Sequence, residues 1–204
     1  MSDTVGRVMV ADDDPDLREC YRLWLGESYD VVAVADGDAV LERLDDTVDV
    51  LLLDREMPET SGKTVAAELA AGPYDPGVLM ISGVEPTVDL LDIPVDEYLT
   101  KPVGRDAVLR SIERVGVVAQ APSEVRELFA LASRAGTLDA TVEQGRLDEC
   151  EEYARLLSRL RAQRSAIDDA LDRTTSTEGW RTAVEAALER SDVDVAVPSV
   201  GARQ

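Results

Sequence analysis

The chain of 204 residues is 45% hydrophobic, which is enough to bury the core of one domain with a smaller appendage. Its 42 acidic and 21 basic residues give a formal net charge of −21, and only Lys63 and Lys101 are lysines. The chain has no histidine, which excludes histidine-based zinc sites, a Ser-His-Asp triad and a phosphohistidine role.

This acidic, lysine-poor composition resembles that of proteins from salt-loving archaea, in which excess charge keeps proteins hydrated and apart. No basic stripe of the kind that binds phosphate backbones is visible. Cys20 and Cys150 fall in different predicted segments and indicate neither a disulfide framework nor a metal site. Because no apolar run is long enough to span a bilayer and no signal peptide is recognisable, we expect a cytoplasmic protein without membrane contact.

Strand-like and helix-like segments alternate through the first 120 residues, a pattern typical of a parallel sheet with helices on both faces. The predicted strands are Arg7–Ala11, Val31–Ala35, Val48–Leu53, Val78–Ser82 and Glu97–Thr100. The predicted helices are Pro15–Ser28, Asp38–Leu44, Gly62–Ala71, a short Thr87–Leu91 and Arg105–Val117. The expected fold class is therefore α/β, with a five-stranded parallel doubly wound sheet of the flavodoxin-like kind.

The rest of the chain reads as helical. A helix over Glu124–Ala135 is predicted to stop at Gly136, and a long polar helix is predicted from Leu147 to Arg173. The long helix has a narrow apolar seam with Arg164 at one position, which favours a coiled coil or a helical hairpin: Tyr153, Leu157, Leu160, Ile167 and Leu171. We expect the seam to pair two chains, although packing within one chain is the alternative. A last helix around Trp180, Val184 and Leu188 and a flexible tail over residues 191–204 complete the prediction.

Three consecutive carboxylates, Asp12, Asp13 and Asp14, directly follow the first strand. Open α/β folds place their ligands at the carboxyl edge of the sheet, where these side chains are expected to lie. Like charges this close need a counter-ion, and Mg²⁺ prefers oxygen ligands. The alternative is an ordinary acidic stretch in a very acidic protein.

Other polar residues end the neighbouring strands. Asp54 follows the apolar run of the third strand and precedes Glu56, and Ser82 ends the fourth strand before a glycine. Lys101 follows Tyr98 at the end of the fifth strand, in a chain that has almost no lysine. All of these side chains are expected at one edge of the sheet. A carboxylate there can attack a phosphoryl donor when a divalent ion and a lysine neutralise the phosphoryl oxygens.

This set closely resembles the receiver domain of two-component response regulators, and the resemblance covers residues 5–118. It implies that Asp54 is the phospho-acceptor and that Asp12, Asp13, Asp54 and the Glu56 backbone carbonyl form a Mg²⁺ site, Asp12 acting through water. It also implies that Ser82 and Lys101 contact the phosphoryl group. By the same resemblance Ser82 and Tyr98 form the switch, and the Lys101–Pro102 step is often cis.

One departure from the family pattern is visible. Only 15 residues separate Ser82 from Tyr98, which is short for a strand–helix–strand connection, so the fourth helix is expected to be curtailed. Residues 122–190 resemble the HalX domain, which follows receivers in halophilic archaea and belongs to regulators described as HoxA-like. The matching features are Leu128–Ser133 and the helix around Glu152 and Tyr153.

The sequence thus predicts a response regulator that accepts a phosphoryl group on Asp54 from a sensor histidine kinase and signals through a helical output module. We expect a homodimer and no enzyme activity beyond Mg²⁺-assisted phosphorylation and dephosphorylation of the chain itself. One alternative is a DNA-binding transcription factor, helped by Arg155, Arg159, Arg161 and Arg164 but not supported by the overall charge. The other is a haloacid-dehalogenase-like phosphatase, which would need an aspartate at the position of Glu56.

Overall fold

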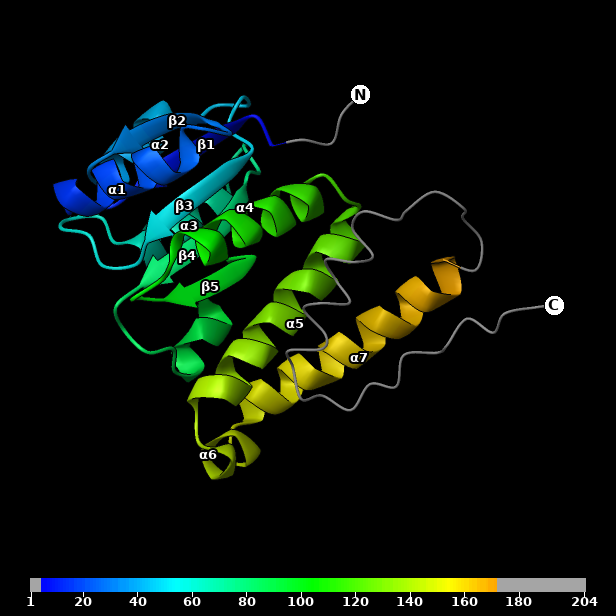
Figure 1. Ribbon diagram of the computed structural model, residues 1–204. Helices are drawn as coiled ribbons and strands as arrows, with labels where there is room; N and C mark the ends of the chain where they lie inside the picture. Colours follow the sequence, from blue (N-terminus) through cyan, green and yellow to red (C-terminus); the bar gives the residue numbers. More distant parts are fainter. Residues whose placement is uncertain (1–4, 172–204) are drawn as a thin grey trace.

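The computed structural model describes residues 5–171, with side chains as far as residue 165. Five parallel strands form one sheet in the order β2-β1-β3-β4-β5. The strands are β1 Arg7–Ala11, β2 Asp30–Val34, β3 Val50–Asp54, β4 Gly77–Ser82 and β5 Glu97–Thr100. Strands β3 and β4 are buried over their whole length, as expected for central strands covered on both faces. The predicted doubly wound α/β fold is confirmed (Figure 1).

Helices cover both faces of the sheet. They are α1 Pro15–Leu25, α2 Gly37–Arg43, α3 Gly62–Ala70 and α4 Arg105–Ala119. The connection from β1 to β2 runs along the sheet in the opposite direction to the connections from β2 to β3 and from β3 to β4. Because such crossovers are right-handed, α1 lies on one face and α2 and α3 lie on the other. Helix α4 packs on β3 and β4 and contacts α1, and α2 contacts α3. Side-chain caps fix where three of these helices begin: Asp14 caps α1 ahead of Pro15, Asp36 caps α2 and Ser61 caps α3.

The connection between β4 and β5 contains no α-helix. It holds one short 3₁₀ helix, η1 Val88–Asp92. This confirms that the helix predicted between the fourth and fifth strands is curtailed. Helix α5, Ser123–Thr141, instead runs beside edge strand β5 and contacts β5, η1 and α4 (Figure 1). An uncovered edge strand is a site for unwanted pairing, and α5 covers this one.

The C-terminal helices form a hairpin. After α5 the chain turns through α6, Gln144–Asp148, and returns as α7, Glu151–Leu171, which packs along α5 and also contacts η1 (Figure 1). Side chains of the hairpin belong to the same hydrophobic cluster as the strands, among them Leu128, Phe129, Leu138, Leu156 and Leu160. The hairpin is therefore packed into the core of the sheet domain. No helix within residues 5–171 combines the length and the apolar character that crossing a membrane requires.

Two predicted boundaries in this region were wrong. The helix predicted to stop at Gly136 continues to Thr141, and Leu138 beyond the glycine is fully buried. A glycine inside a helix costs about 1 kcal/mol, less than burying a leucine contributes. The long helix begins at Glu151 rather than at Leu147, because Leu147 is buried in the separate helix α6 where the chain reverses.

The seam of the long helix is used inside the chain. Tyr153 and Leu160 are buried, Leu157 is partly buried, and Arg164 is buried among them. The structure therefore contains the alternative, a hairpin within one chain. The homodimer remains a prediction, but this seam no longer supports it. The side chains of Ile167 and Leu171, the predicted last helix and the predicted tail lie outside the described residues.

Gly62 at the start of α3 offers a test of how tightly this helix fits against the end of β3. A Cβ atom there would lie 2.1 Å from the Asp54 carbonyl oxygen and 3.0 Å from the Arg55 Cα. We expect Gly62→Ala to lower the free energy of unfolding by about 1–3 kcal/mol, measured by urea denaturation at constant salt. Gly145→Ala in α6 is the control, because a Cβ there meets nothing within 4 Å. Equal unfolding midpoints for the two variants would show that α3 can move away without loss.

Candidate functional site

Three strand ends meet around one ammonium group. Lys101, directly after β5, places its Nζ atom 2.8 Å from Asp12 Oδ2 after β1 and 2.8 Å from Asp54 Oδ1 at the end of β3. The side chain of Lys101 is 21% exposed, whereas those of Asp12 and Asp54 are 2% and 7% exposed. The sheet topology thus brings together three charged residues that lie far apart in the sequence.

Backbone groups hold the other carboxylate oxygens. The Glu56 N–H donates to Asp54 Oδ2 at 2.9 Å, and the Asp14 N–H donates to Asp12 Oδ1 at 2.9 Å. The guanidinium of Arg18 donates to the Asp12 carbonyl at 2.6 Å. Both carboxylates are therefore fixed in direction by the loops that follow their strands.

Burial disfavours the charges of Asp54 and Lys101, and the hydrogen bonds between them favour those charges. Burial raises the pKa of Asp54 above its ordinary value, against the lowering effect of the Lys101 hydrogen bond. Burial by itself would lower the pKa of Lys101, but its hydrogen bonds to Asp12 and Asp54 outweigh burial and hold that pKa above its ordinary value. Lys101 therefore remains an ammonium group at neutral pH.

Ser82 and Tyr98 meet at the first residues after β4. Ser82 is fully buried, and its Oγ accepts a hydrogen bond from the Val84 N–H at 3.0 Å. The hydroxyl of Tyr98 donates to the Val84 carbonyl at 2.8 Å, with the ring buried. Both side chains thus hold the same residue of the β4–η1 loop. The Lys101–Pro102 peptide bond is cis.

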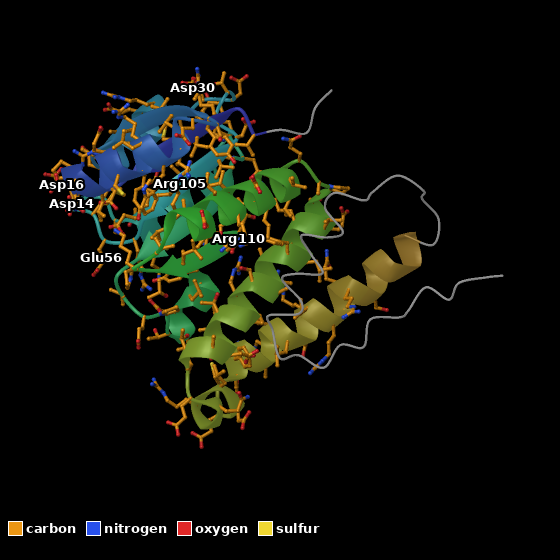
Figure 2. The ribbon with its side chains drawn as sticks, in the orientation of Figure 1. Asp14, Asp16, Asp30, Glu56, Arg105 and Arg110 are labelled. Carbon is orange, nitrogen blue, oxygen red and sulfur yellow. The ribbon has the colours of Figure 1, made fainter. Side chains whose placement is uncertain are left out.

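The remaining acidic residues lie at the margin. Asp13 and Glu56 have exposed side chains, and the Asp14 side chain caps the N-terminus of α1. Figure 2 shows Asp14, Asp16 and Glu56 at the end of the sheet where the strands finish, away from Asp30. Among the side chains that the structure describes, no three acidic, cysteine or histidine groups are gathered as a ready-made metal site.

Two further residues of the site, Arg55 and Asp89, are not marked by the sequence pattern. Arg55, directly after Asp54, forms an ion pair with Asp89 of η1. Burial would lower the pKa of Arg55, but the Tyr98 hydroxyl and the Asp89 carboxylate outweigh burial and raise it. Arg55 Nη1 is buried without a hydrogen-bond partner in the described part of the chain. The one available signal was the position of Arg55 next to the strand-end aspartate.

The chemistry of the donors suits a hard divalent cation. One ammonium group faces two buried carboxylates, and Asp13 adds a third carboxylate at the margin. Mg²⁺ is usually held by only one or two carboxylates with water and phosphate oxygens, so it does not need a protein cage. The residues present therefore fit this ion.

Comparisons with known proteins agree with this geometry. The family model described as response regulator receiver domain matches residues 8–113, and the model described as HalX domain matches residues 118–188. Receiver domains generally bind Mg²⁺. The receiver domain of the Francisella response regulator 1452 has 24% sequence identity and a TM-score of 0.50, covering 54% of this chain and 96% of that one, which shows a shared fold.

Two curated proteins extend the comparison. A Haloferax volcanii protein named "Putative transcriptional regulator" is 41% identical over 190 residues, covering 89% of this chain and 32% of its own length. Protein-glutamate methylesterase/protein-glutamine glutaminase 2 of Caulobacter vibrioides is 35% identical over 136 residues, covering 63% of this chain and 38% of its own length. The chain thus spans about a third of the length of each relative.

Removing the ammonium group should leave two buried carboxylates uncompensated. We expect Lys101→Met to lower the free energy of unfolding by about 3 kcal/mol at neutral pH in buffer without divalent cations, measured by urea denaturation. Lys63→Met is the matched control, because Lys63 is the other lysine and is exposed. A loss no larger than that of the control would mean that the carboxylates do not depend on Lys101.

Proposed function

Because the chain belongs to the response regulator receiver family, we propose that it accepts a phosphoryl group on Asp54 and passes the signal to its C-terminal helical hairpin. In this proposal residues 5–118 are the receiver, and residues 122–190 are the output domain, of which α5–α7 are the described part. The proposed phosphoryl donor is a sensor histidine kinase, the partner that membership of the receiver family implies.

The observation that carries the proposal is the pair of ion pairs that Lys101 forms with Asp12 and Asp54. A carboxylate attacking a phosphoryl group must overcome the repulsion between two anions. Lys101 already lies 2.8 Å from the attacking carboxylate, where its charge can neutralise incoming phosphoryl oxygens. Asp54 Oδ2 is held by the Glu56 N–H, so the carboxylate is oriented before the donor arrives.

Asp12, Asp13, Asp54 and the Glu56 carbonyl are the proposed ligands of Mg²⁺, which would neutralise phosphoryl charge during transfer. By resemblance to other receiver domains, Asp12 would act through water, while its two oxygens accept hydrogen bonds from Lys101 and the Asp14 N–H. The phosphatase alternative would use Glu56 as a general acid. Its side chain is exposed, which gives that alternative no support.

The β4–η1 loop is the proposed route from Asp54 to the hairpin. Ser82 accepts from the Val84 N–H and keeps its own hydroxyl hydrogen for a phosphoryl oxygen. Movement of Ser82 toward the phosphoryl group would weaken its hold on Val84, which Tyr98 holds from the other side. The new negative charge would also compete with Asp89 for Arg55.

The hairpin touches this loop directly. Helix α7 contacts η1, and the hydroxyl of Thr141 at the end of α5 lies 3.4 Å from the Pro86 carbonyl. A shift of η1 therefore has to change the packing of the hairpin. The β4–β5 connection itself holds only the short η1, and both long helices of the hairpin contact it.

We propose transcription regulation through protein contacts as the output, in line with the name of the Haloferax volcanii relative. The arginine cluster on α7 gives little support to direct DNA binding. Arg155 pairs with Glu151, Arg159 pairs with Glu127, and Arg164 is buried. Among these four arginines only Arg161 is exposed without an ion pair in the described part of the chain. A homodimer remains a prediction that light scattering would decide.

Phosphorylation should depend on one residue. We expect incubation with a small phosphodonor and Mg²⁺ in concentrated KCl to add one phosphoryl group to the wild type and none to Asp54→Asn, read by intact mass. Asp46→Asn is the control, because Asp46 is exposed and lies before β3, at the opposite end from Asp54. Full labelling of Asp54→Asn would place the acceptor elsewhere.

The Tyr98 hydroxyl should matter for transmission and not for phosphorylation. We expect Tyr98→Phe, which removes the bond to the Val84 carbonyl and about 1 kcal/mol of stability, to accept phosphoryl normally. Its phosphorylation-induced change in hydrogen exchange over α5 and α7 should be smaller than that of the wild type. Tyr29→Phe, remote from this loop, serves as the control. Identical exchange changes in all three proteins would rule out this route.

A further inference from the structure

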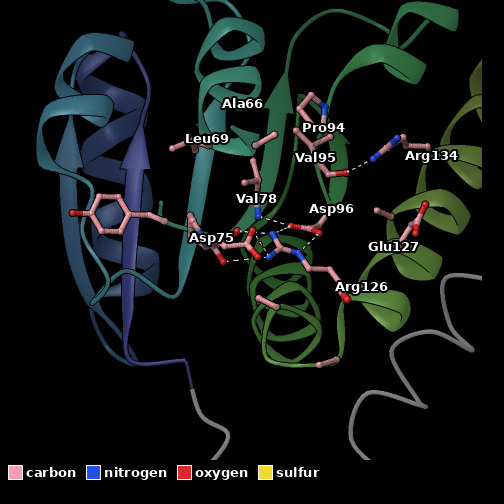
Figure 3. A pocket seen from close by; sticks show the side chains of 17 residues that line it. Ala66, Leu69, Asp75, Val78, Pro94, Val95, Asp96, Arg126, Glu127 and Arg134 are labelled. Carbon is pink, nitrogen blue, oxygen red and sulfur yellow. Dashed lines mark hydrogen bonds and ion pairs between the residues drawn. The ribbon is translucent and has the colours of Figure 1, made fainter. Parts of the chain in front are cut away.

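A second polar site lies where the hairpin joins the sheet, at the opposite end of the strands from Asp54. An open cavity of about 490 Å³ is lined by the end of α3, the start of β4, the residues just before β5, and helix α5 (Figure 3). Its volume lies within the usual range for small-molecule sites. The walls combine apolar side chains, such as Leu69, Val78 and Pro94, with the guanidinium groups of Arg126 and Arg134.

Arg126 is fully compensated. Its Nε and Nη2 atoms donate to the two oxygens of Asp96 at 2.9 and 2.8 Å, and Nη1 lies 2.7 Å from an Asp75 oxygen. Nη2 also donates to the Pro76 carbonyl at 2.6 Å. Figure 3 shows this guanidinium between Asp75 and Asp96. These contacts fasten the first turn of α5 to the sheet and leave Arg126 no need of a ligand.

Arg134, two turns further along α5, has no such partner. Its Nη2 lies 3.4 Å from the Val95 carbonyl, and its Nε is buried with no hydrogen-bond partner within residues 5–165. Burial lowers the pKa of Arg134 below its ordinary value, although Asp96 and Glu127 act in the opposite direction. A guanidinium cannot lose its proton under ordinary conditions, so the charge persists.

The nearby carboxylates are already engaged. Asp96 is paired with Arg126 and also accepts the Val78 N–H at 2.7 Å. Glu127 is paired with Arg159 of α7. An uncompensated guanidinium beside a cavity is destabilising until an anion pairs with it.

We propose that this cavity binds a small organic carboxylate, whose two oxygens pair with the Arg134 guanidinium and whose apolar part lies against Leu69, Val78 and Pro94. The planar guanidinium matches the geometry of a carboxylate. A singly charged anion is favoured over phosphate, because Asp75, Asp96 and Glu127 surround the cavity. Because these wall side chains are apolar, the cavity favours an aliphatic acid over chloride.

Such a ligand would act on the joint between the two parts of the chain. The cavity has walls from α3, β4 and the residues just before β5 on one side and from α5 on the other, so it exists only while α5 is docked. A carboxylate would therefore stabilise the docked arrangement by mass action. This would be an input separate from phosphorylation of Asp54.

The test uses the full chain and sodium butyrate as the probe. Thermal unfolding is followed with increasing butyrate, with sodium chloride and sodium phosphate at matched ionic strength as the comparison salts. We expect butyrate to raise the wild-type Tm in a saturable way beyond both comparison salts. Arg134→Met should weaken butyrate binding about tenfold or more, because a charge-assisted pair is lost.

Two further readouts separate binding from a structural role. Without butyrate, Arg134→Met should be at least as stable as the wild type, because it removes a guanidinium whose Nε is buried without a hydrogen-bond partner in the described part of the chain. Arg161→Met, at an exposed position of α7, should keep the full response to butyrate. The proposal is overturned if chloride or phosphate matches butyrate, if butyrate gives no saturable shift, or if Arg134→Met responds like the wild type.

Discussion

The repulsion between Asp12 and Asp54, and its relief by Lys101, is the constraint on which this structure depends. Two carboxylates with almost no solvent exposure face the same ammonium group at 2.8 Å. Burial disfavours an isolated charge, and it raises the pKa of Asp54 above its ordinary value. The pairing requires β1, β3 and β5 to end at one edge of the sheet, and the parallel order β2-β1-β3-β4-β5 achieves this.

The short β4–β5 connection explains why the two parts of the chain form one structure. With only η1 between these strands, edge strand β5 lacks the cover that a full helix in that connection would give. Helix α5 supplies the cover, and Phe129 and Leu138 enter the core that the strands share. Arg126 adds a buried ion pair with Asp96 at the same joint. Because α5 and α7 both contact η1, a shift of η1 would change the packing of the hairpin.

The arginines show how tertiary structure assigns roles to residues of one type. Arg155 and Arg159 look like a basic surface in the sequence, but acidic neighbours neutralise both. Arg126 connects α5 to the sheet, and Arg55, directly after β3, pairs with Asp89 of η1. Arg134 is the one of these whose guanidinium lies beside a cavity without a carboxylate partner among the described residues.

The sequence by itself determined the strands, their parallel arrangement and the residues at their ends. Apolar runs such as Leu51–Leu53 are local signals, and the residue that follows a buried strand must appear at the edge of the sheet. The placement of Asp12, Asp54 and Lys101 together was therefore predictable. The roles of Arg55, Asp89 and Arg134 were not, because each depends on a contact between segments that are distant in the chain. The course of α5 through Gly136 was also decided by tertiary structure. Local propensity marks a glycine as a stop, and only burial of the following turn against the sheet and α7 outweighs that preference.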